Sequence, residues 1–237
     1  MPAIQGSPSP HRWNQIKRLQ LHRGIETLEQ YERAVLAGTL DAVVYLRRTQ
    51  TLHGLTCSDL GQVHYQIFKA VHPWAGQFRR IGESRMIGSF PTADPQRITR
   101  DLELAIFQMC ELVEGAVSAA DSMQMLAALA FFHIRFERVH PFLDGNGRTG
   151  RAILTVQSEQ AFGVAVEFTD QAGYREALRT STRSDIAPFL NYLGSSLELP
   201  RARAPWPAPF RISPRFLEAA DGRPTFEEDL AWSRAVS

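Results

Sequence analysis

The feature that most constrains this chain lies near its middle, where residues 126–136 are apolar on nearly every side of a helix. A helix that is apolar all the way round belongs in the interior of a protein. The longest apolar run, Met125 to Phe132, is far shorter than the ~20 residues that a helix needs to cross a bilayer. We therefore expect a central, buried helix in a soluble domain.

Segments on both sides of this stretch have the composition of helices. Thr27, with Gln30 three positions later, predicts a capped helix that Gly38 is expected to end. Further helices are predicted from Thr39 and from Ser58. The sequence therefore predicts an all-α fold for most of the chain.

Two segments depart from the helical pattern. Residues 76–95 are punctuated by glycine and close in prolines, which predicts a β-hairpin or extended flap. Beyond Pro200, prolines recur too often for a regular helix, and we expect disorder. The expected parts are a loose N-terminal tail (1–12), N-terminal helices (13–59), a helical core that contains the flap (60–198) and a proline-rich C-terminal extension (199–237).

The stretch HPFLDGNGRTGR, residues 140–151, matches two familiar patterns that both fail. Its glycines satisfy G-x-G-x-x-G, but a dinucleotide fingerprint needs a preceding strand, and the residues before it have helical composition. Asp144 begins a possible calcium loop, but Thr149 stands where that loop needs glycine and Thr155 where it needs glutamate. Neither a Rossmann fold nor an EF-hand is expected.

An ordinary helix–turn–helix connection would also explain this stretch, because Asp-Gly and Asn-Gly are common turn dipeptides. A plain turn, however, does not require a histidine, an aspartate and two arginines at these offsets. Glycines at 145 and 147 let the backbone take positive φ and approach a ligand closely, and the N-terminus of the following helix favours anions. The combination predicts a phosphate-binding turn between two helices.

Four charged or titratable side chains complete this predicted site. Arg148 and Arg151 share one helix face and can both reach phosphate oxygens. The Asp144 carboxylate is suited to a Mg²⁺ ion shared with phosphates. His140, with an ordinary pKa near neutrality, is suited to take a proton from a hydroxyl.

The nine residues HPFLDGNGR resemble the Fic motif, H-P-F-x-[D/E]-G-N-[G/K]-R, at every defined position, and Arg151 matches the second arginine of its extended form. The resemblance covers about residues 60–195. It implies an all-α core with a β-hairpin flap over the active site. It also implies transfer of AMP from ATP to a Ser, Thr or Tyr hydroxyl of a target protein, which makes the chain a nucleotidyltransferase.

The resemblance also implies a role for each motif residue. His140 would be the general base and Asp144 the Mg²⁺ ligand, Gly145, Asn146 and Gly147 would cradle the α- and β-phosphates, Arg148 and Arg151 would hold the β- and γ-phosphates, and Pro141 and Phe142 would fix the loop. In the flap, Arg85, Met86 and Ile87 would bind the target by β-augmentation.

Glycine at position 147 distinguishes between subclasses of this family, because the kinase-like members carry lysine there. Glycine favours AMP transfer over transfer of the γ-phosphate. Two alternatives stay open: transfer of phosphate or UMP by the same fold, and a nucleotide-binding interaction module that has lost its activity.

Many family members silence themselves with a helix that carries [S/T]-x-x-x-E-[G/N]. Thr99–Glu103 and Thr155–Glu159 have the first spacing, but leucine and glutamine follow them. We therefore expect a separate small antitoxin to supply the inhibitory glutamate, with this chain as the toxin. By family analogy, type II topoisomerase subunits are the first candidate targets.

Bulk properties limit the other partners. The formal net charge is +1, whereas dedicated nucleic-acid binders usually carry a basic surplus, so no stable nucleic-acid binding is expected. The N-terminal residues contain no apolar run of the kind found in secretory signals. We expect a cytoplasmic protein that does not bind membranes.

Overall fold

The computed structural model describes residues 10–83, 86–87, 90–182 and 185–197 of the chain. Its elements are helices α1 (Pro10–Lys17), α2 (Leu28–Arg47) and α3 (Cys57–Phe68), strands β1 (Met86–Ile87) and β2 (Phe90–Pro91), a 3-10 turn (Pro95–Arg97), and helices α4 (Ile98–Ala119), α5 (Ser122–Val139), α6 (Asn146–Phe162), α7 (Gln171–Thr180) and α8 (Ala187–Ser196). The described part of the chain is almost wholly helical, as predicted.

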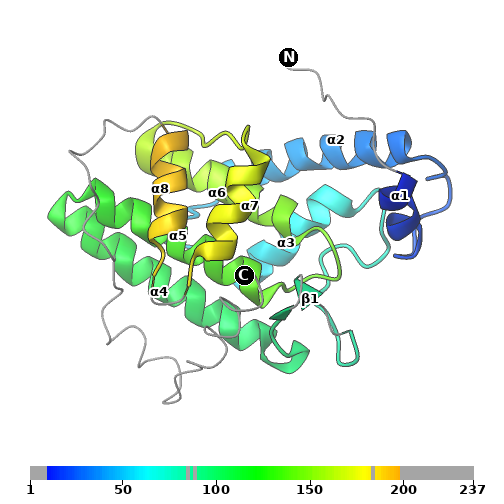
Figure 1. The fold of residues 1–237 in the computed structure, drawn as a ribbon, viewed down its shortest axis with the longest axis horizontal. Helices are drawn as coiled ribbons and strands as arrows, with labels where there is room; N and C mark the ends of the chain where they lie inside the picture. The colour runs from blue at the N-terminus through cyan, green and yellow to red at the C-terminus, as the bar shows by residue number, and fades with distance from the viewer. Residues whose placement is uncertain (1–9, 84–85, 88–89, 183–184, 198–237) are drawn as a thin grey trace.

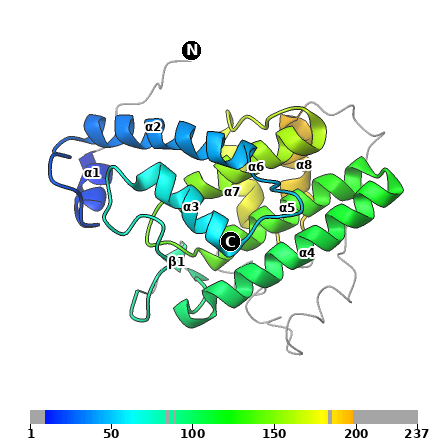
Figure 2. The same cartoon turned by 180° about the vertical axis from the view of Figure 1, so that it is seen from behind.

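Helix α5 lies at the centre of this arrangement, as its apolar composition predicts. Its side chains from Met125 to Ile134 are all buried. It packs against α4, α6 and α8. Seen from the two sides, α7 and α8 cover one face of the molecule and α2 and α3 cover the other (Figures 1 and 2). None of the described helices is both long enough and apolar enough to span a bilayer.

Helices α4 and α5 pack against each other as a hairpin (Figure 1). Ala120 closes α4 in the left-handed region with φ 51°, and the Asp121 side chain then accepts hydrogen bonds from the first backbone N–H groups of α5. Because the connection is so short, the two helices are antiparallel neighbours. The hairpin thereby fixes where α5 ends, at Val139, and so where the motif of residues 140–151 begins.

The predicted break at Gly38 is wrong, because α2 continues as one helix through Arg47. The predicted capping box is present: the Thr27 side chain accepts from the Gln30 N–H, and the Gln30 side chain accepts from the Thr27 N–H. Gly38 is buried and lies against α3, where an added Cβ would come within 2.4 Å of the Ile67 carbonyl oxygen. The glycine therefore serves close helix packing rather than helix termination.

Two other local expectations are modified by the structure. Residues 10–12, assigned to a loose tail, begin α1, so the tail prediction is wrong for them. Helix α3 is capped by Thr56, with Asp59 completing its capping box, two residues before the predicted start at Ser58. Residues 1–9 of the tail and 199–237 of the extension lie outside the described residues.

Strands β1 and β2 pair antiparallel, with Met86 opposite Pro91 and Ile87 opposite Phe90. They lie within the segment 76–95 that the sequence predicts to be a hairpin or flap. Position 85 lies outside the described residues.

Substituting Gly38 by alanine tests the close contact between α2 and α3. The new methyl group would meet two backbone carbonyls, which cannot rotate away, so the helices must separate. We expect the free energy of unfolding to fall by about 1–3 kcal/mol in urea denaturation. Gly54→Ala is the matched control, because its Cβ would lie 3.4 Å from the nearest atom, an ordinary contact. Equal urea midpoints for the two variants would contradict this account.

Candidate active site

The motif loop, residues 140–145, connects α5 to α6 through two left-handed residues. His140 has φ 50° and ends α5, and Gly145 has φ 81° and precedes α6. Glycine at 145 is needed for two reasons: its φ is positive, and an added Cβ would lie 2.3 Å from the Phe68 ring. Gly147, by contrast, lies inside α6, so the expectation of positive φ at that position is wrong.

Asn146 closes this loop with its side chain. Its Nδ2 donates to the Phe142 carbonyl oxygen and its Oδ1 accepts from the Phe142 N–H, both at 2.8 Å. The residue is buried, with 1% of its surface exposed. Its amide is therefore occupied within the protein, and only its backbone N–H faces the N-terminal end of α6.

His64, from α3, holds the same loop from the opposite side. Its Nε2 lies 3.0 Å from the Asp144 carbonyl oxygen, and its Nδ1 accepts from the Gly76 N–H at 2.8 Å. Since a carbonyl can only accept and an amide N–H only donate, the proton must be on Nε2. The ring stacks on Phe142 with centroids 3.9 Å apart, and burial lowers its pKa to about 3, so it stays neutral. Sequence analysis missed this residue, which carries no motif signal.

Arg79 is a second anchor that sequence analysis missed. Its guanidinium is buried and donates to the carbonyl oxygens of Val139 and His140, at the end of α5. It also donates to the carbonyl oxygens of Glu83 and Ala93, which flank the two short strands in sequence. One side chain thus connects the base of the predicted flap to the start of the motif loop.

Backbone pairing strengthens this connection. The Arg79 N–H donates to the Pro141 carbonyl oxygen at 2.8 Å, and Phe78 forms an isolated antiparallel bridge with Phe142. Phe142 itself is fully buried. The segment that precedes the strands therefore runs alongside the motif loop as a short strand-like pair.

Replacing Arg79 by methionine tests this anchor. Four carbonyl groups would lose a charged donor in the protein interior, at about 1.5–3 kcal/mol for each hydrogen bond to a charged group when it is well formed. We expect a loss of at least about 2 kcal/mol in the free energy of unfolding, measured by urea denaturation. The neighbouring variant Arg80→Met should change it by less than about 0.5 kcal/mol, because Arg80 is exposed. If both variants unfold at the same midpoint, Arg79 is not an anchor.

His140 is oriented by the backbone around it. Its Nδ1 lies 3.3 Å from the Glu137 carbonyl oxygen, and its own carbonyl accepts from Arg79. Because a carbonyl only accepts, this contact favours the tautomer with the proton on Nδ1 and the lone pair on Nε2. A lone pair at Nε2 is what a general base requires.

The N-terminal turn of α6 lies where the sequence predicts an anion-binding element. The Gly145 carbonyl accepts from the N–H groups of Arg148 and Thr149 at 3.1 and 3.0 Å, so the earlier N–H groups of Asn146 and Gly147 remain at the open helix end. The helix dipole makes this end attractive to anions.

The two motif arginines flank this turn and contact different helices. The Arg148 guanidinium carbon lies 5.9 and 5.7 Å from the ring centroids of Tyr31 and Phe68, on α2 and α3. The Arg151 guanidinium carbon lies 5.3 Å from the ring centroid of Tyr174, on α7. Their charges therefore reach the helix end from two sides.

Asp144 combines a restrained backbone with an available carboxylate. His64 fixes its carbonyl, whereas its carboxylate oxygens accept no hydrogen bond from any described residue. Across the described ranges, no cluster of three or more His, Cys, Asp or Glu side chains could hold a metal by itself. A single hard oxygen donor of this kind fits a Mg²⁺ ion that takes its other ligands from phosphate and water.

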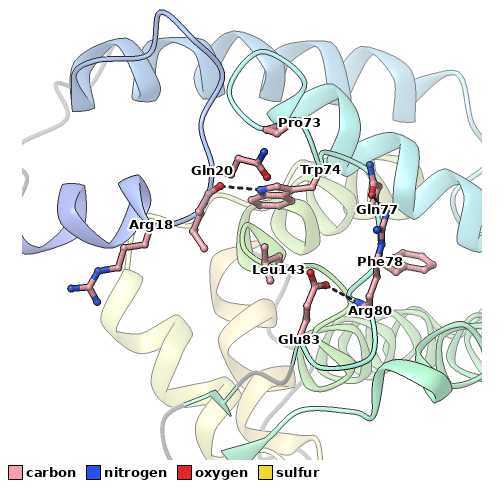
Figure 3. Close-up of a pocket in the computed structure, with 10 residues that line it drawn as sticks. Arg18, Gln20, Pro73, Trp74, Gln77, Phe78, Arg80, Glu83 and Leu143 are labelled. Atoms are coloured by element: carbon pink, nitrogen blue, oxygen red, sulfur yellow. Dashed lines mark hydrogen bonds between the residues drawn. The ribbon is translucent and has the colours of Figure 1, made fainter.

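A pocket of about 440 Å³ adjoins the motif loop. Leu143, the variable residue of the motif, reaches into it, and Trp74, Arg80 and Glu83 form part of its wall (Figure 3). The Trp74 indole N–H donates to the Leu19 carbonyl oxygen, and the Glu83 carboxylate accepts from the Arg80 backbone N–H. The N-terminal segment, the turn after α3 and the base of the flap segment thus meet beside the motif.

The structure therefore brings together the residues that the motif predicts, in a helical domain, around the open N-terminal end of α6. Of the predicted flap residues, Met86 and Ile87 form β1, and position 85 lies outside the described residues. Their role in target binding stays a prediction.

Comparison with known proteins shows a likeness to one family. Residues 54–158 match the model of the Fic/DOC family. A protein adenylyltransferase Fic from Nematostella vectensis is 26% identical over 172 residues, which are 70% of this chain and 38% of that protein. A second, from Culex quinquefasciatus, is 27% identical over 149 residues, 61% of this chain and 28% of the relative. The chain thus spans well under half the length of these relatives.

Solved structures share the fold. A crystal structure of the BepC protein from Bartonella tribocorum with bound AMPPNP aligns with a TM-score of 0.56 at 16% identity, over 75% of this chain and 90% of that one. Fic-1 from C. elegans, residues 134–508, aligns with a TM-score of 0.58 at 21% identity, over 78% of this chain and 55% of that one. At such identities the likeness establishes the fold alone.

Proposed function

We propose that this chain is a protein adenylyltransferase that transfers AMP from ATP to a Ser, Thr or Tyr hydroxyl of a target protein. The observation that carries the proposal is the motif loop, which brings His140, the Asp144 carboxylate and two arginines around one open helix end. The relatives named protein adenylyltransferase and the neighbour with bound AMPPNP support this assignment.

In the proposed reaction, His140 Nε2 takes the proton of the target hydroxyl. The hydroxyl oxygen bonds to the α-phosphorus of ATP, and the bond from that phosphorus to the oxygen that bridges to the β-phosphate breaks, which releases pyrophosphate. The N–H groups of Gly147 and Asn146 would bind the α- and β-phosphates, and Arg148 and Arg151 the β- and γ-phosphates. These groups stabilise charge that develops on the phosphates in the transition state.

Asp144 is the residue that would hold Mg²⁺. Its carboxylate has no partner among the described residues, and its backbone is fixed by His64. A magnesium ion bound there neutralises phosphate charge. The two arginines and the N-terminal end of α6 would stabilise the rest of the negative charge on the phosphates.

Gly147 supports AMP transfer over phosphate transfer. In the structure it lies beside the Arg151 guanidinium, whose Nη1 would be 3.2 Å from a Cβ at this position. A long cationic side chain at 147 would therefore compete with Arg151 for the same phosphate oxygens. With glycine, that space belongs to Arg151 alone.

Target binding and regulation complete the proposal. Main-chain hydrogen bonds to the flap around Met86 and Ile87, with Arg85 beside them, would hold the target segment by β-augmentation. A cytoplasmic toxin, held inactive by a small antitoxin and directed at type II topoisomerase subunits by family analogy, is the biological role that we infer. Of the two glutamates with inhibitory spacing, Glu159 forms an ion pair with Arg47 on α2, at 3.0 Å. That pairing supports an inhibitory glutamate supplied from another chain.

Label transfer tests the proposed chemistry. The chain is incubated with Mg²⁺ and a bacterial lysate, in parallel with ATP labelled at the α-phosphate and at the γ-phosphate. We expect a labelled protein band with the α-label only, and a decrease of about 10²–10⁴-fold in His140→Ala, because the general base is lost. His53→Ala is the matched control, because His53 is exposed and lies outside the motif. A band with the γ-label only would make the chain a kinase, and no band with either label would favour a binding module or another nucleotide donor.

The metal role of Asp144 is tested by Asp144→Asn. Removing the carboxylate charge should raise the Mg²⁺ concentration for half-maximal label transfer by at least about tenfold, because a metal loses its one charged protein ligand. Asp41→Asn, an exposed carboxylate on α2 that pairs with Lys69, should leave that concentration unchanged. An unchanged Mg²⁺ requirement in Asp144→Asn would remove this residue from the metal site.

A further inference from the structure

A buried group of polar side chains lies behind Arg151, on the side away from α2 and α3. The Arg151 guanidinium spans from the first turn of α6, beside Gly147, to the Tyr174 ring on α7. The Tyr174 hydroxyl is hydrogen-bonded to His133 Nε2 on α5 at 2.8 Å. His133 in turn stacks on Phe189 of α8, with ring centroids 5.1 Å apart. Arg151 therefore lies against a group of contacting side chains that come from α7, α5 and α8.

Glu137, also on α5, is the acidic member of this group. Its side chain is 14% exposed, and Oε1 lies 3.9 Å from His133 Nε2. The same oxygen would be 2.6 Å from a Cβ at position 150, so the carboxyl group lies directly against the backbone of α6 next to Arg151. Oε1 is buried and accepts no hydrogen bond from a described residue. Neither the predicted chemistry nor the motif uses this carboxyl group.

The charges that face Glu137 can be counted element by element. On its own helix, His133 is neutral, because burial lowers its pKa to about 3. On α7, burial raises the pKa of Tyr174 well above its usual value, and on α8 it raises that of Tyr192, so both are neutral. On α6, Arg151 carries a permanent positive charge. Arg151 is therefore the charge that offsets an ionised Glu137.

Two opposing effects act on the Glu137 carboxyl group. Burial raises its pKa to about 7, and the neighbouring Arg151 charge lowers it. The carboxyl group thus changes its charge near neutral pH, within the range in which Arg151 must also bind phosphate. Neutralisation of Arg151 by Glu137 and binding of a phosphate by Arg151 compete for the same positive charge.

We propose that Glu137 is a positioning residue for Arg151, and that its carboxyl group takes up a proton when the triphosphate of a nucleotide binds at the end of α6. This inference rests on the proposed function, because it takes Arg151 as a phosphate ligand. Phosphate charge next to Arg151 withdraws that cation from Glu137 and adds negative charge nearby, and both effects favour the protonated carboxyl group.

The sign of the pH dependence follows. Nucleotide binding raises the pKa of Glu137 above its value in the free protein, so the complex holds more protons than the free protein between the two values. Affinity therefore increases as the pH falls through this window and is constant on either side of it. Each unit by which binding raises the pKa changes the affinity about tenfold across the window.

Isothermal titration calorimetry tests the coupling without requiring any transferase activity. AMPPNP with Mg²⁺ is titrated into the full chain at several pH values from 6 to 9, in buffers of different ionisation enthalpy. We expect a net proton uptake that is largest between about pH 7 and 8, with affinity decreasing as the pH rises. Glu137→Gln, which has an uncharged side chain of the same shape, should take up fewer protons than the natural chain and show a smaller decrease in affinity over this pH range.

Glu159→Gln is the matched control, because it makes the same chemical change on α6 at a carboxylate that pairs with Arg47 instead. It should take up protons as the natural chain does. Protonation of the nucleotide itself is common to all variants and cancels in the comparison. Equal proton uptake in Glu137→Gln and the natural chain would overturn the proposal.

A second measurement is independent of nucleotide binding. In a carboxyl-directed ¹³C NMR titration of the free protein, the signal missing from Glu137→Gln identifies Glu137. Its pKa should rise in Arg151→Gln, which removes the offsetting charge, and stay unchanged in Arg48→Gln, an exposed arginine at the end of α2. A pKa unmoved by Arg151→Gln would overturn the pairing. If AMPPNP does not bind but the pKa moves, the pairing stands and the proposed function fails.

Discussion

The arrangement of this site depends on how six residues between α5 and α6 are held in one conformation. Phe142 is the centre of that constraint, because its ring is buried against His64 while both of its backbone polar groups are bonded to the Asn146 side chain. A buried backbone N–H or carbonyl without a partner would cost as much as a lost hydrogen bond. The paired amide removes that cost and orients His140, Asp144 and the open end of α6 relative to one another.

Burial also decides which groups near the site carry charge. His64 and His133 are held neutral because desolvation lowers their pKa values to about 3, and burial lowers that of His72 as well. The positive charge at the anion site therefore comes from the two motif arginines and the helix end. These sources do not vary with pH in the physiological range, whereas the carboxyl group of Glu137 does. A pH response that arises behind Arg151 would then follow the charge of the Glu137 carboxyl group.

Much of the fold followed from local pattern. The buried α5, the capping box at Thr27 and the helix–turn–helix around the motif were all predicted and are all present. Two of the predictions that failed concern glycines. Gly38 and Gly147 both lie within helices. The predictions failed because a glycine that permits close approach of another segment looks the same in the sequence as one that ends a helix or turns the chain.

The sequence by itself determined the motif and the order of the helices, because these depend on short-range spacing along the chain. Tertiary structure alone decided which distant residues support that site. His64 lies 80 positions before the carbonyl that it holds, and Arg79 lies about 60 positions before the end of α5. Glu137 and Arg151 are separated in sequence by the motif itself and become neighbours only when α6 packs on α5. No local periodicity encodes such contacts, since they arise from the packing of whole helices.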